Sequence, residues 1–286
     1  MVKSLLHSAD EPCTPLNAAL AIIRGHKIPL DVATLKQRKT LFFSVLMLAW
    51  GILVPQKERS LGDNSVASGL IADIDIESEK YRWMGSARFD FYAVQRILNL
   101  RRYNGRIMFV PAPQFGYLGE ERRCESEEVV DSGEEERRGY GGPKREGENL
   151  EWRVVNGPFV AIWLHNVPWG GETTLAAPDA KFSDGFIDLI VVKPCPRAAL
   201  LSLMTGISKG DHVKSPYVMY LKVKEFVLEP GQQVGNAKIG GIIDVDGEVL
   251  ARGNGVYMSH LKALMSYEPL RISVEQGLAT VFAPRS

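Results

Sequence analysis

The sequence predicts a mainly β (α+β) protein whose principal part is an antiparallel β-sandwich. After residue 28, short apolar segments follow one another with turn residues between them, and few strand–helix–strand alternations occur. The composition supports a packed core, because 45% of the 286 residues are hydrophobic and 24% are charged. These observations exclude a doubly wound sheet as the main architecture, and they exclude disorder throughout.

The elements justify this fold class in order. An Ala-rich helix is expected at 17–24 and ends at Gly25. A strand with alternating apolar residues starts at 28, and the apolar, aromatic run at 40–50 predicts one strand covered on both faces. A strand at 71–76 and a helix at 87–102 follow, with 103–105 closing the helix. Further strands are expected at 106–111, 159–164, 186–192, 217–228, 242–245, 248–251, 272–274 and 278–282, and one helix at 197–208.

The charge and the cysteines limit the function classes. Lys and Arg number 34, as do Asp and Glu, so the basic excess typical of nucleic-acid binders is absent and no nucleic-acid partner is expected. Cys13, Cys124 and Cys195 lie far apart, which disfavours a zinc site and favours a reduced, intracellular protein. The nearly apolar run at 41–55 is shorter than the roughly 18–20 residues of a membrane span, so a buried strand is expected there.

Two segments read as loops inserted into this scaffold. Residues 51–68 are polar and follow directly on a predicted core strand. Residues 119–149 contain 11 acidic and 6 basic residues and almost no apolar ones, so they cannot build a core. For 119–149 a solvated loop is the first interpretation, and a docking segment for a basic partner is the alternative.

Carboxylates are concentrated at 73–77, where Asp73, Asp75 and Glu77 alternate on one predicted strand face. Such acids repel one another unless a cation or a ligand amine lies among them. Arg82 and Arg88 follow, and their planar guanidinium groups suit phosphate oxygens. A structural network of ion pairs explains the same residues equally well.

Two Asp-Gly pairs also stand out. Asp-Gly between apolar segments first of all predicts a hairpin turn, and this applies to 184–185 and to 246–247. At the second turn, alternation would place Asp244, Asp246 and Glu248 on one face, where they could hold Mg²⁺ or hydroxyl groups. The five histidines are scattered and are expected to be structural or exposed.

Taken together, these motifs resemble the sphingosine (sphingoid long-chain base) kinases, most closely the plant members. The resemblance rests on the Leu-Ala-Trp-Gly at 48–51, the segment 70–82, the Tyr-Asn-Gly-Arg-Ile at 103–107, the segment 177–185 and the Asp-Gly-Glu at 246–248, which follow in the family's order. It covers nearly the whole chain except the two inserted segments. Within the diacylglycerol-kinase-like lipid kinases, it implies an N-terminal α/β nucleotide domain and a C-terminal β-sandwich that holds the lipid.

The resemblance implies that residues 1–27 are a short helical remnant of the nucleotide domain and that 28–286 form the substrate domain. It implies transfer of the ATP γ-phosphate, with Mg²⁺, to the primary hydroxyl of a sphingoid base. Asp75 would bind the ammonium headgroup of the base. Nucleotide contacts would come from Arg82, Arg88, Asp246, Gly247 and Glu248.

The chain also departs from the family pattern. The family's phosphate-binding glycine loop and its Gly-Asp-Gly motif, whose aspartate is the general base, are not in this sequence. Loss of a general base lowers rates by about 10²–10⁴, so the chain by itself is expected to be weakly active or inactive. If residues 51–68 are left out, the sequence on their two sides matches the family's pattern without a gap.

Two functions are compatible with these motifs and with the departures from the family pattern. The first is a sphingoid-base kinase represented by its C-terminal part, and the alternative is a non-catalytic lipid-binding module without a nucleotide site. A cytoplasmic protein that visits the surface of intracellular membranes is expected, because the substrate is a membrane lipid and no anchor is visible in the sequence.

Overall fold

The computed structural model describes residues 1–51, 100–115, 120–121, 151–171, 173–256 and 262–285. Its helices are α1 (Val2–His7), α2 (Pro15–Arg24) and α5 (Arg197–Gly206), with the 3-10 turns η2 (Pro113–Phe115), η3 (Ile207–Lys209) and η4 (Asp211–Lys214). Its strands are β1 (Lys27–Gln37), β2 (Thr40–Ser44), β3 (Met47–Gly51), β4 (Tyr103–Pro111), β5 (Glu120–Glu121), β6 (Arg153–Asn156), β7 (Ala161–His165), β8 (Ile187–Val192), β9 (Val218–Gln233), β10 (Ile242–Val245), β11 (Glu248–Arg252) and β12 (Leu270–Phe282).

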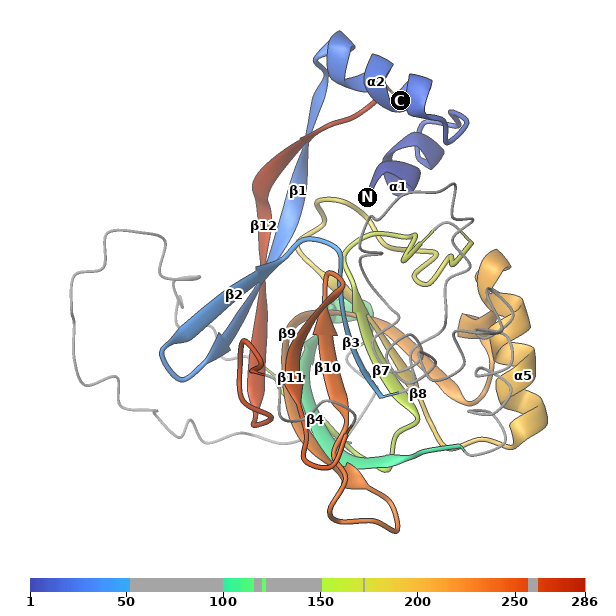
Figure 1. Cartoon of the computed structure of the whole chain (residues 1–286). Helices are drawn as coiled ribbons and strands as arrows, with labels where there is room; N and C mark the ends of the chain where they lie inside the picture. The colour runs from blue at the N-terminus through green and yellow to red at the C-terminus, as the bar shows by residue number, and fades with distance from the viewer. Residues whose placement is uncertain (52–99, 116–119, 122–150, 172, 257–261, 286) are drawn as a thin grey trace.

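The described strands join into one strongly curled antiparallel sheet. Their order is β11-β10-β3-β7-β8-β9-β12-β1-β2, and β4 leaves this path to pair with both β9 and β6. Figure 1 shows how β4, β9, β10 and β11 curve around beside β3 and β7, while β1, β2 and β12 extend away from the body. The mainly antiparallel β architecture expected from the sequence is therefore confirmed.

The curled sheet encloses one large apolar core. Trp50 of β3, Phe109 of β4 and Phe226 of β9 are fully buried in it, and so are Leu35 of β1 and Leu189 of β8. Burying apolar area from so many strands at once contributes about 25 cal/mol per Å². This core therefore holds the two halves of the curled sheet together.

The hydroxyl group of Tyr267, which packs against this core, joins three parts of the chain by hydrogen bonds. Tyr267 Oη accepts hydrogen bonds from Trp50 Nε1 at 2.9 Å and from Gly241 N at 2.8 Å, and it donates to Gly231 O at 2.8 Å. A Cβ atom at position 241 would lie 2.7 Å from Trp50 Nε1. Glycine is therefore required at 241 so that the backbone can approach the indole closely.

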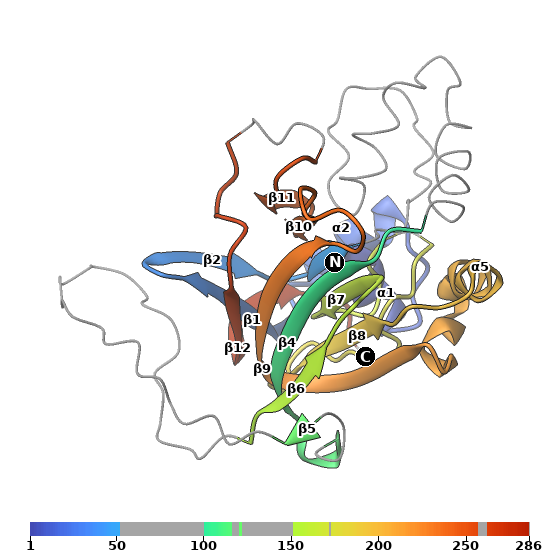
Figure 2. The same cartoon turned by 90° about the horizontal axis from the view of Figure 1, so that it is seen from below.

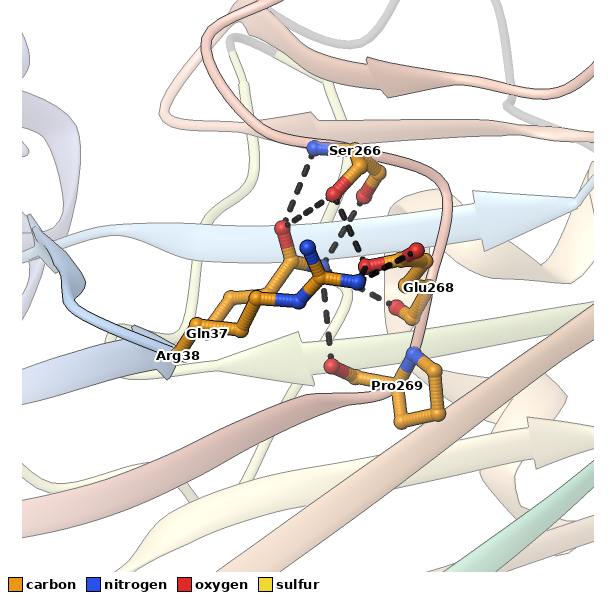
Figure 3. Close-up of polar contacts among 5 residues, drawn as sticks. All are labelled: Gln37, Arg38, Ser266, Glu268 and Pro269. Carbon is orange, nitrogen blue, oxygen red and sulfur yellow. Dashed lines mark hydrogen bonds and ion pairs between the residues drawn. The ribbon is translucent and has the colours of Figure 1, made fainter. Parts of the chain in front are cut away.

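The loop that leads into β12 is anchored to the β1–β2 hairpin (Figure 3). Gln37 Nε2 donates to the carbonyl oxygens of Ser266, Glu268 and Pro269, and Gln37 Oε1 accepts from the Ser266 backbone N–H and hydroxyl. Arg38, at the hairpin turn with φ 53°, pairs with the Glu268 carboxylate at 2.9 Å. A single amide side chain thus satisfies five polar groups of this loop.

The helix expected at 17–24 is confirmed as α2. It begins earlier than expected because the Thr14 side chain caps it by accepting from Asn17 N, and Pro15 occupies the first helical position. It ends at Gly25, whose φ of 70° is the left-handed conformation that glycine adopts most readily. The short helix α1 was not expected, and the domain boundary at residue 27 stays a prediction.

The single strand expected at 40–50 is wrong, because β2 and β3 are separate strands with a bend at 45–46. The two strands expected at 272–274 and 278–282 are instead one strand, β12. Residues 103–105, expected to close a helix, begin β4. Apolar periodicity does not distinguish a bend between two strands from a continuous strand, because both bury the same side chains.

Most of the other predicted elements that lie within the described residues have a counterpart in the structure. The strands expected from 159 to 251 correspond to β7, β8, β9, β10 and β11, and the helix expected at 197–208 corresponds to α5 followed by η3. The strand expected at 71–76 lies outside the described residues, as do the expected helix up to residue 99 and nearly all of both predicted insertions. Within the described part of the chain, no helix is long and apolar enough to cross a bilayer.

Candidate functional site

The Asp-Gly-Glu segment lies at the hairpin turn between β10 and β11. Asp246 and Gly247 both have positive φ, 51° and 94°, as a two-residue hairpin turn of the left-handed type requires. The hairpin expected from the Asp-Gly pair at 246–247 is therefore confirmed. The hairpin expected at 184–185 is wrong, because this turn precedes β8 and, within the described residues, no strand leads into it from the other side.

Asp246 uses its carboxylate to hold the bend between β2 and β3. Its Oδ1 accepts from Ser44 Oγ at 2.7 Å, from Met47 N at 2.9 Å and from Leu46 N at 3.1 Å, while its Oδ2 accepts from Val45 N at 2.9 Å. The backbone N–H groups that a continuous strand would have donated to a neighbour are thus donated to one side chain. This carboxylate is the physical reason why the run at 40–50 is divided.

Asp244, two residues earlier, lies in a different environment. Its side chain is buried and accepts from Gly247 N at 3.2 Å. Burial raises the pKa of Asp244 to about 7, and the carboxylates of Asp246 and Glu248 add to this rise. Asp244 is therefore partly protonated near neutral pH.

Glu248 is the exposed carboxylate of the turn, and it has no polar partner within the described part of the chain. The expectation that Asp244, Asp246 and Glu248 share one face is therefore wrong, since the first is buried, the second binds the β2–β3 bend and the third faces outward. The described residues contain no group of three His, Cys, Asp or Glu side chains that could hold a metal ion. Mg²⁺ binding stays a prediction.

The other residues predicted for the site, Asp75, Arg82 and Arg88, lie outside the described residues. In the sequence, the segment that contains them follows Gly51, the last residue of β3. Gly51 has a φ of 99°, and a Cβ atom there would lie 2.5 Å from Val160 O. Glycine is therefore required at position 51, where the backbone lies close to β7.

A second candidate region lies on the outer face of the sheet, beneath α5. Both views place α5 beside β8, outside the curled sheet (Figures 1 and 2). A pocket opens between them, and its walls are almost wholly apolar. We call it the α5 pocket, and it is lined by Val160, Ala161, Trp163, Val192, Leu200, Leu203, Met204, Ile207, His212 and Val218. Its walls suit an apolar group, and its volume of about 30 Å³ has room for a small group but not for a whole hydrocarbon chain.

A buried ionic network lies on the same face of the sheet. Lys222 Nζ is 2.7 Å from Asp188 and 2.9 Å from Asp184, and Tyr220 donates its hydroxyl proton to Asp188 at 2.6 Å. Burial raises the pKa of Asp188 to about 6, although Lys222 and Tyr220 stabilise its charged form. Burial opposes the charge on Lys222, but Asp188 and Asp184 outweigh it and raise the pKa of Lys222. The network attaches the Asp-Gly turn at 184–185 to β8 and β9.

The α5 pocket was not predicted from the sequence. Leu200, Leu203 and Ile207 follow the helical spacing at 197–208, but that spacing does not separate core residues from residues that line a pocket. Lys222 was missed as well, because it lies in a strand that otherwise reads as amphipathic.

Comparison with known proteins shows which proteins this chain is similar to. Residues 146–256 match the family model described as the YegS C-terminal NAD kinase beta sandwich-like domain. Sphingosine kinase 1 of Arabidopsis thaliana is 58% identical over 284 residues, which are 99% of this chain and 55% of that protein. Sphingosine kinase 2 of the same plant is 57% identical over the same shares of the two chains. This chain is a homologue of the plant sphingosine kinases.

The homology extends beyond plants. Sphingosine kinase 1 of Homo sapiens is 32% identical over 240 residues, which are 82% of this chain and 54% of that protein. The chain thus spans about half the length of the sphingosine kinases that it matches. The resemblance to a lipid-kinase β-sandwich, inferred from short motifs, is confirmed by similarity along nearly the whole chain.

Proposed function

We propose that this chain is the lipid-binding part of an ATP-dependent kinase that phosphorylates a sphingoid long-chain base. The observation that carries the proposal is 58% identity over 99% of the chain to a sphingosine kinase. Identity at this level, spread along nearly the whole chain, supports a shared substrate class. The apolar α5 pocket supports the same class, since a sphingoid base has one long hydrocarbon chain.

In this proposal, the two ends of the base are recognised by different interactions, one apolar and one ionic. The hydrocarbon chain enters between α5 and the sheet, where the α5 pocket widens to admit it, and each buried methylene group contributes about 0.8 kcal/mol. The ammonium headgroup binds the carboxylate of Asp75, which gives an opposite charge and up to two acceptor oxygens. A lipid without the amine would therefore bind more weakly.

The nucleotide contacts form the second part of the proposal. Arg82 and Arg88 bind the phosphate oxygens of ATP, and Gly247 and Glu248 reach the nucleotide from the β10–β11 turn. Asp246 supports nucleotide binding indirectly by holding the β10–β11 turn in place, because its carboxylate already accepts four hydrogen bonds from the β2–β3 bend. Mg²⁺, when bound with ATP, would neutralise phosphate charge.

The reaction itself is phosphoryl transfer. The primary hydroxyl oxygen of the base attacks the γ-phosphorus of ATP, the bond from that phosphorus to the β,γ-bridging oxygen breaks, and ADP leaves. The hydroxyl proton passes to a general base. In the family this is the aspartate of a Gly-Asp-Gly motif, which is not in this sequence. We therefore expect weak or no turnover from the chain by itself.

The test is phosphorylation of sphingosine with γ-labelled ATP. The chain is assayed by itself and after fusion to the remaining N-terminal part of Arabidopsis sphingosine kinase 1. We expect labelled sphingosine phosphate from the fusion, and little from the chain by itself. The matched control is the fusion with Asp75→Asn, which keeps the shape and removes the charge. An inactive fusion that nevertheless binds ATP and folds cooperatively would contradict the kinase proposal.

The alternative is a non-catalytic lipid-binding module, favoured by the α5 pocket combined with the missing Gly-Asp-Gly sequence. Calorimetric titration separates the two proposals. A module of this kind binds the base and no nucleotide, whereas the kinase part also shows ATP affinity that falls on Glu248→Gln. Because the base is a membrane lipid, both proposals include transient binding to a bilayer surface.

A further inference from the structure

The chain contains Asn-Gly pairs at 104–105, 156–157 and 254–255, and Asp-Gly pairs at 184–185 and 246–247. In such pairs the backbone nitrogen of the glycine can attack the carbonyl carbon of the preceding side chain, because glycine has no side chain to hinder the approach. The pairs are chemically alike, so their surroundings in the fold decide which of them reacts.

Hydrogen bonds hold the glycine nitrogen in three of these pairs. The donors and their acceptors are Gly157 N to Gly105 O at 2.8 Å, Gly185 N to Asp31 Oδ2 at 2.7 Å, and Gly247 N to Asp244 Oδ1 at 3.2 Å. The attack begins with loss of the glycine N–H proton, so a hydrogen-bonded N–H reacts only after the structure opens locally.

The pair at 104–105 lies within the sheet. Asn104 belongs to β4, which pairs with both β9 and β6. A Cβ atom at Gly231 of β9 would lie 2.2 Å from Asn104 O, so the backbone of β9 packs directly against this residue. In an extended strand the next backbone nitrogen points away from the side-chain carbonyl group. Ring closure at Asn104 therefore requires β4 to leave the sheet.

The pair at 254–255 lies in an exposed turn that follows the end of β11. Asn254 and Gly255 are both exposed, and Gly255 has a φ of 67°. Within the described part of the chain, no hydrogen bond involves the Gly255 N–H or the Asn254 side chain. This pair therefore lacks the restraints that hold the other four.

The reaction at this turn needs only water as a co-reactant. The deprotonated nitrogen of Gly255 forms a bond to Cγ of Asn254, the bond from Cγ to the side-chain nitrogen breaks, and ammonia leaves with the proton that the solvent returns. Water then opens the succinimide ring. Opening at Cγ gives aspartate, whereas opening at the backbone carbonyl carbon gives isoaspartate, in which the main chain runs through Cβ and Cγ.

The isoaspartate form would disturb a close backbone contact. Asn254 O accepts from Gly240 N at 2.8 Å, and a Cβ atom at Gly253 would lie 2.5 Å from Gly240 Cα. The next N–H group, that of Gly241, donates to Tyr267 Oη at 2.8 Å. In isoaspartate the carbonyl group of residue 254 becomes a carboxylate outside the main chain, so the hydrogen bond from Gly240 is lost.

We propose that Asn254 is a site of spontaneous deamidation, and that the isoaspartate formed there loosens the end of β11 from the segment that leads into β10. The reaction needs neither lipid nor nucleotide, so it is separate from the proposed kinase activity.

Ageing of the full chain in mildly alkaline buffer tests this. Peptide mass spectrometry follows the conversion of amide to acid at Asn104, Asn156 and Asn254, in the folded chain and in guanidinium chloride. In the denaturant the three residues should react at similar rates, because glycine follows each of them. In the folded chain we expect Asn254 to react at least about tenfold faster than the other two, the ratio that an opening free energy of about 1.4 kcal/mol supplies.

Unfolding of the aged chain tests the structural consequence. Chains with isoaspartate at 254 are identified by their labelling with an isoaspartyl methyltransferase, and they should unfold at a lower denaturant concentration than fresh chains. Asn254→Gln keeps the amide and makes ring closure slow, so this variant should keep its stability on ageing. Asn104→Gln is the matched control and should age as the wild-type chain does.

The outcomes decide both parts of the proposal. If Asn254 in the folded chain reacts as slowly as Asn104 and Asn156, while all three react in the denaturant, the fold protects the turn and the proposal is overturned. If all three react equally fast in the folded chain, the contacts at 104 and 156 give no protection and the proposal is overturned too. If Asn254 reacts first and the aged chain keeps its stability, the deamidation site stands and the loosening is refuted.

Discussion

At the residue scale, Asp246 shows how one side chain determines the path of the backbone. Four donors from 44–47 converge on its two oxygens, so a run that reads as a single strand turns a corner. The neighbouring Glu248 belongs to the same motif and is exposed. The two acids of the motif therefore differ: the carboxylate of Asp246 holds the β2–β3 bend, whereas that of Glu248 faces solvent.

This division predicts opposite results for two isosteric substitutions. Asp246→Asn replaces an acceptor oxygen by a donor and removes the charge, so we expect a loss of about 2–3 kcal/mol in the free energy of unfolding, measured by urea denaturation. Glu248→Gln is the control and should change that free energy by less than about 0.5 kcal/mol. Equal stability of the two variants would contradict the clamp assigned to Asp246.

At the scale of elements, α5 faces the sheet with one side and solvent with the other. Leu200 and Leu203 are buried against the outer apolar cluster, whereas Leu201 is 51% exposed. The helix is short, and most of its stability comes from this packing rather than from its own hydrogen bonds. It therefore forms one wall of the α5 pocket.

The pocket assignment predicts a contrast within this one helix. Leu203→Phe adds volume inside the pocket and should reduce the rise in melting temperature that sphingosine produces, since a ligand stabilises the folded state in proportion to its affinity. Leu201→Phe adds the same volume on the exposed side and should leave that rise unchanged. Thermal melts with and without sphingosine measure both. An unchanged rise for Leu203→Phe would exclude the α5 pocket as the lipid site.

At the scale of the whole molecule, stability depends on two acids, Asp244 and Asp188, that are buried on the same outer face of the sheet. Burial raises the pKa of Asp244 to about 7 and that of Asp188 to about 6, from an ordinary value of 3.8. An acid whose pKa is higher in the folded state binds more protons there than in the unfolded chain. Its contribution to stability is therefore complete below about pH 4 and is lost as the pH rises to the folded pKa.

We predict that Asp244→Asn removes one part of this pH dependence. Between pH 4.5 and 7.5, the free energy of unfolding of the wild-type chain should fall by on the order of 2–4 kcal/mol relative to that of the variant. The wild-type chain must be compared with the variant, because the lowered pKa of His165 changes the stability of both proteins in the opposite direction below pH 6.5. Urea unfolding at several pH values measures it, and a difference independent of pH would show that Asp244 ionises normally.

The sequence by itself determined the class of the fold and the family. Strand-length apolar segments between turn residues required an antiparallel sheet, since only pairing buries so many short segments. The Asp-Gly pair at 246–247 determined the hairpin, because positive φ at two successive residues is open to few residue types. The helix at 17–24 followed from its local stop signal, Gly25. Each of these features depends on residues close together in the chain.

Only the tertiary structure decided features that join distant residues. The break in the run at 40–50 depends on Asp246, about 200 positions away, and the core of the sheet depends on the hydroxyl of Tyr267 meeting Trp50. The α5 pocket combines residues of β7, β8, β9 and α5, which lie far apart in the sequence. Periodicity reports which side chains are apolar, whereas the identity of a partner across the fold depends on how the whole sheet curls.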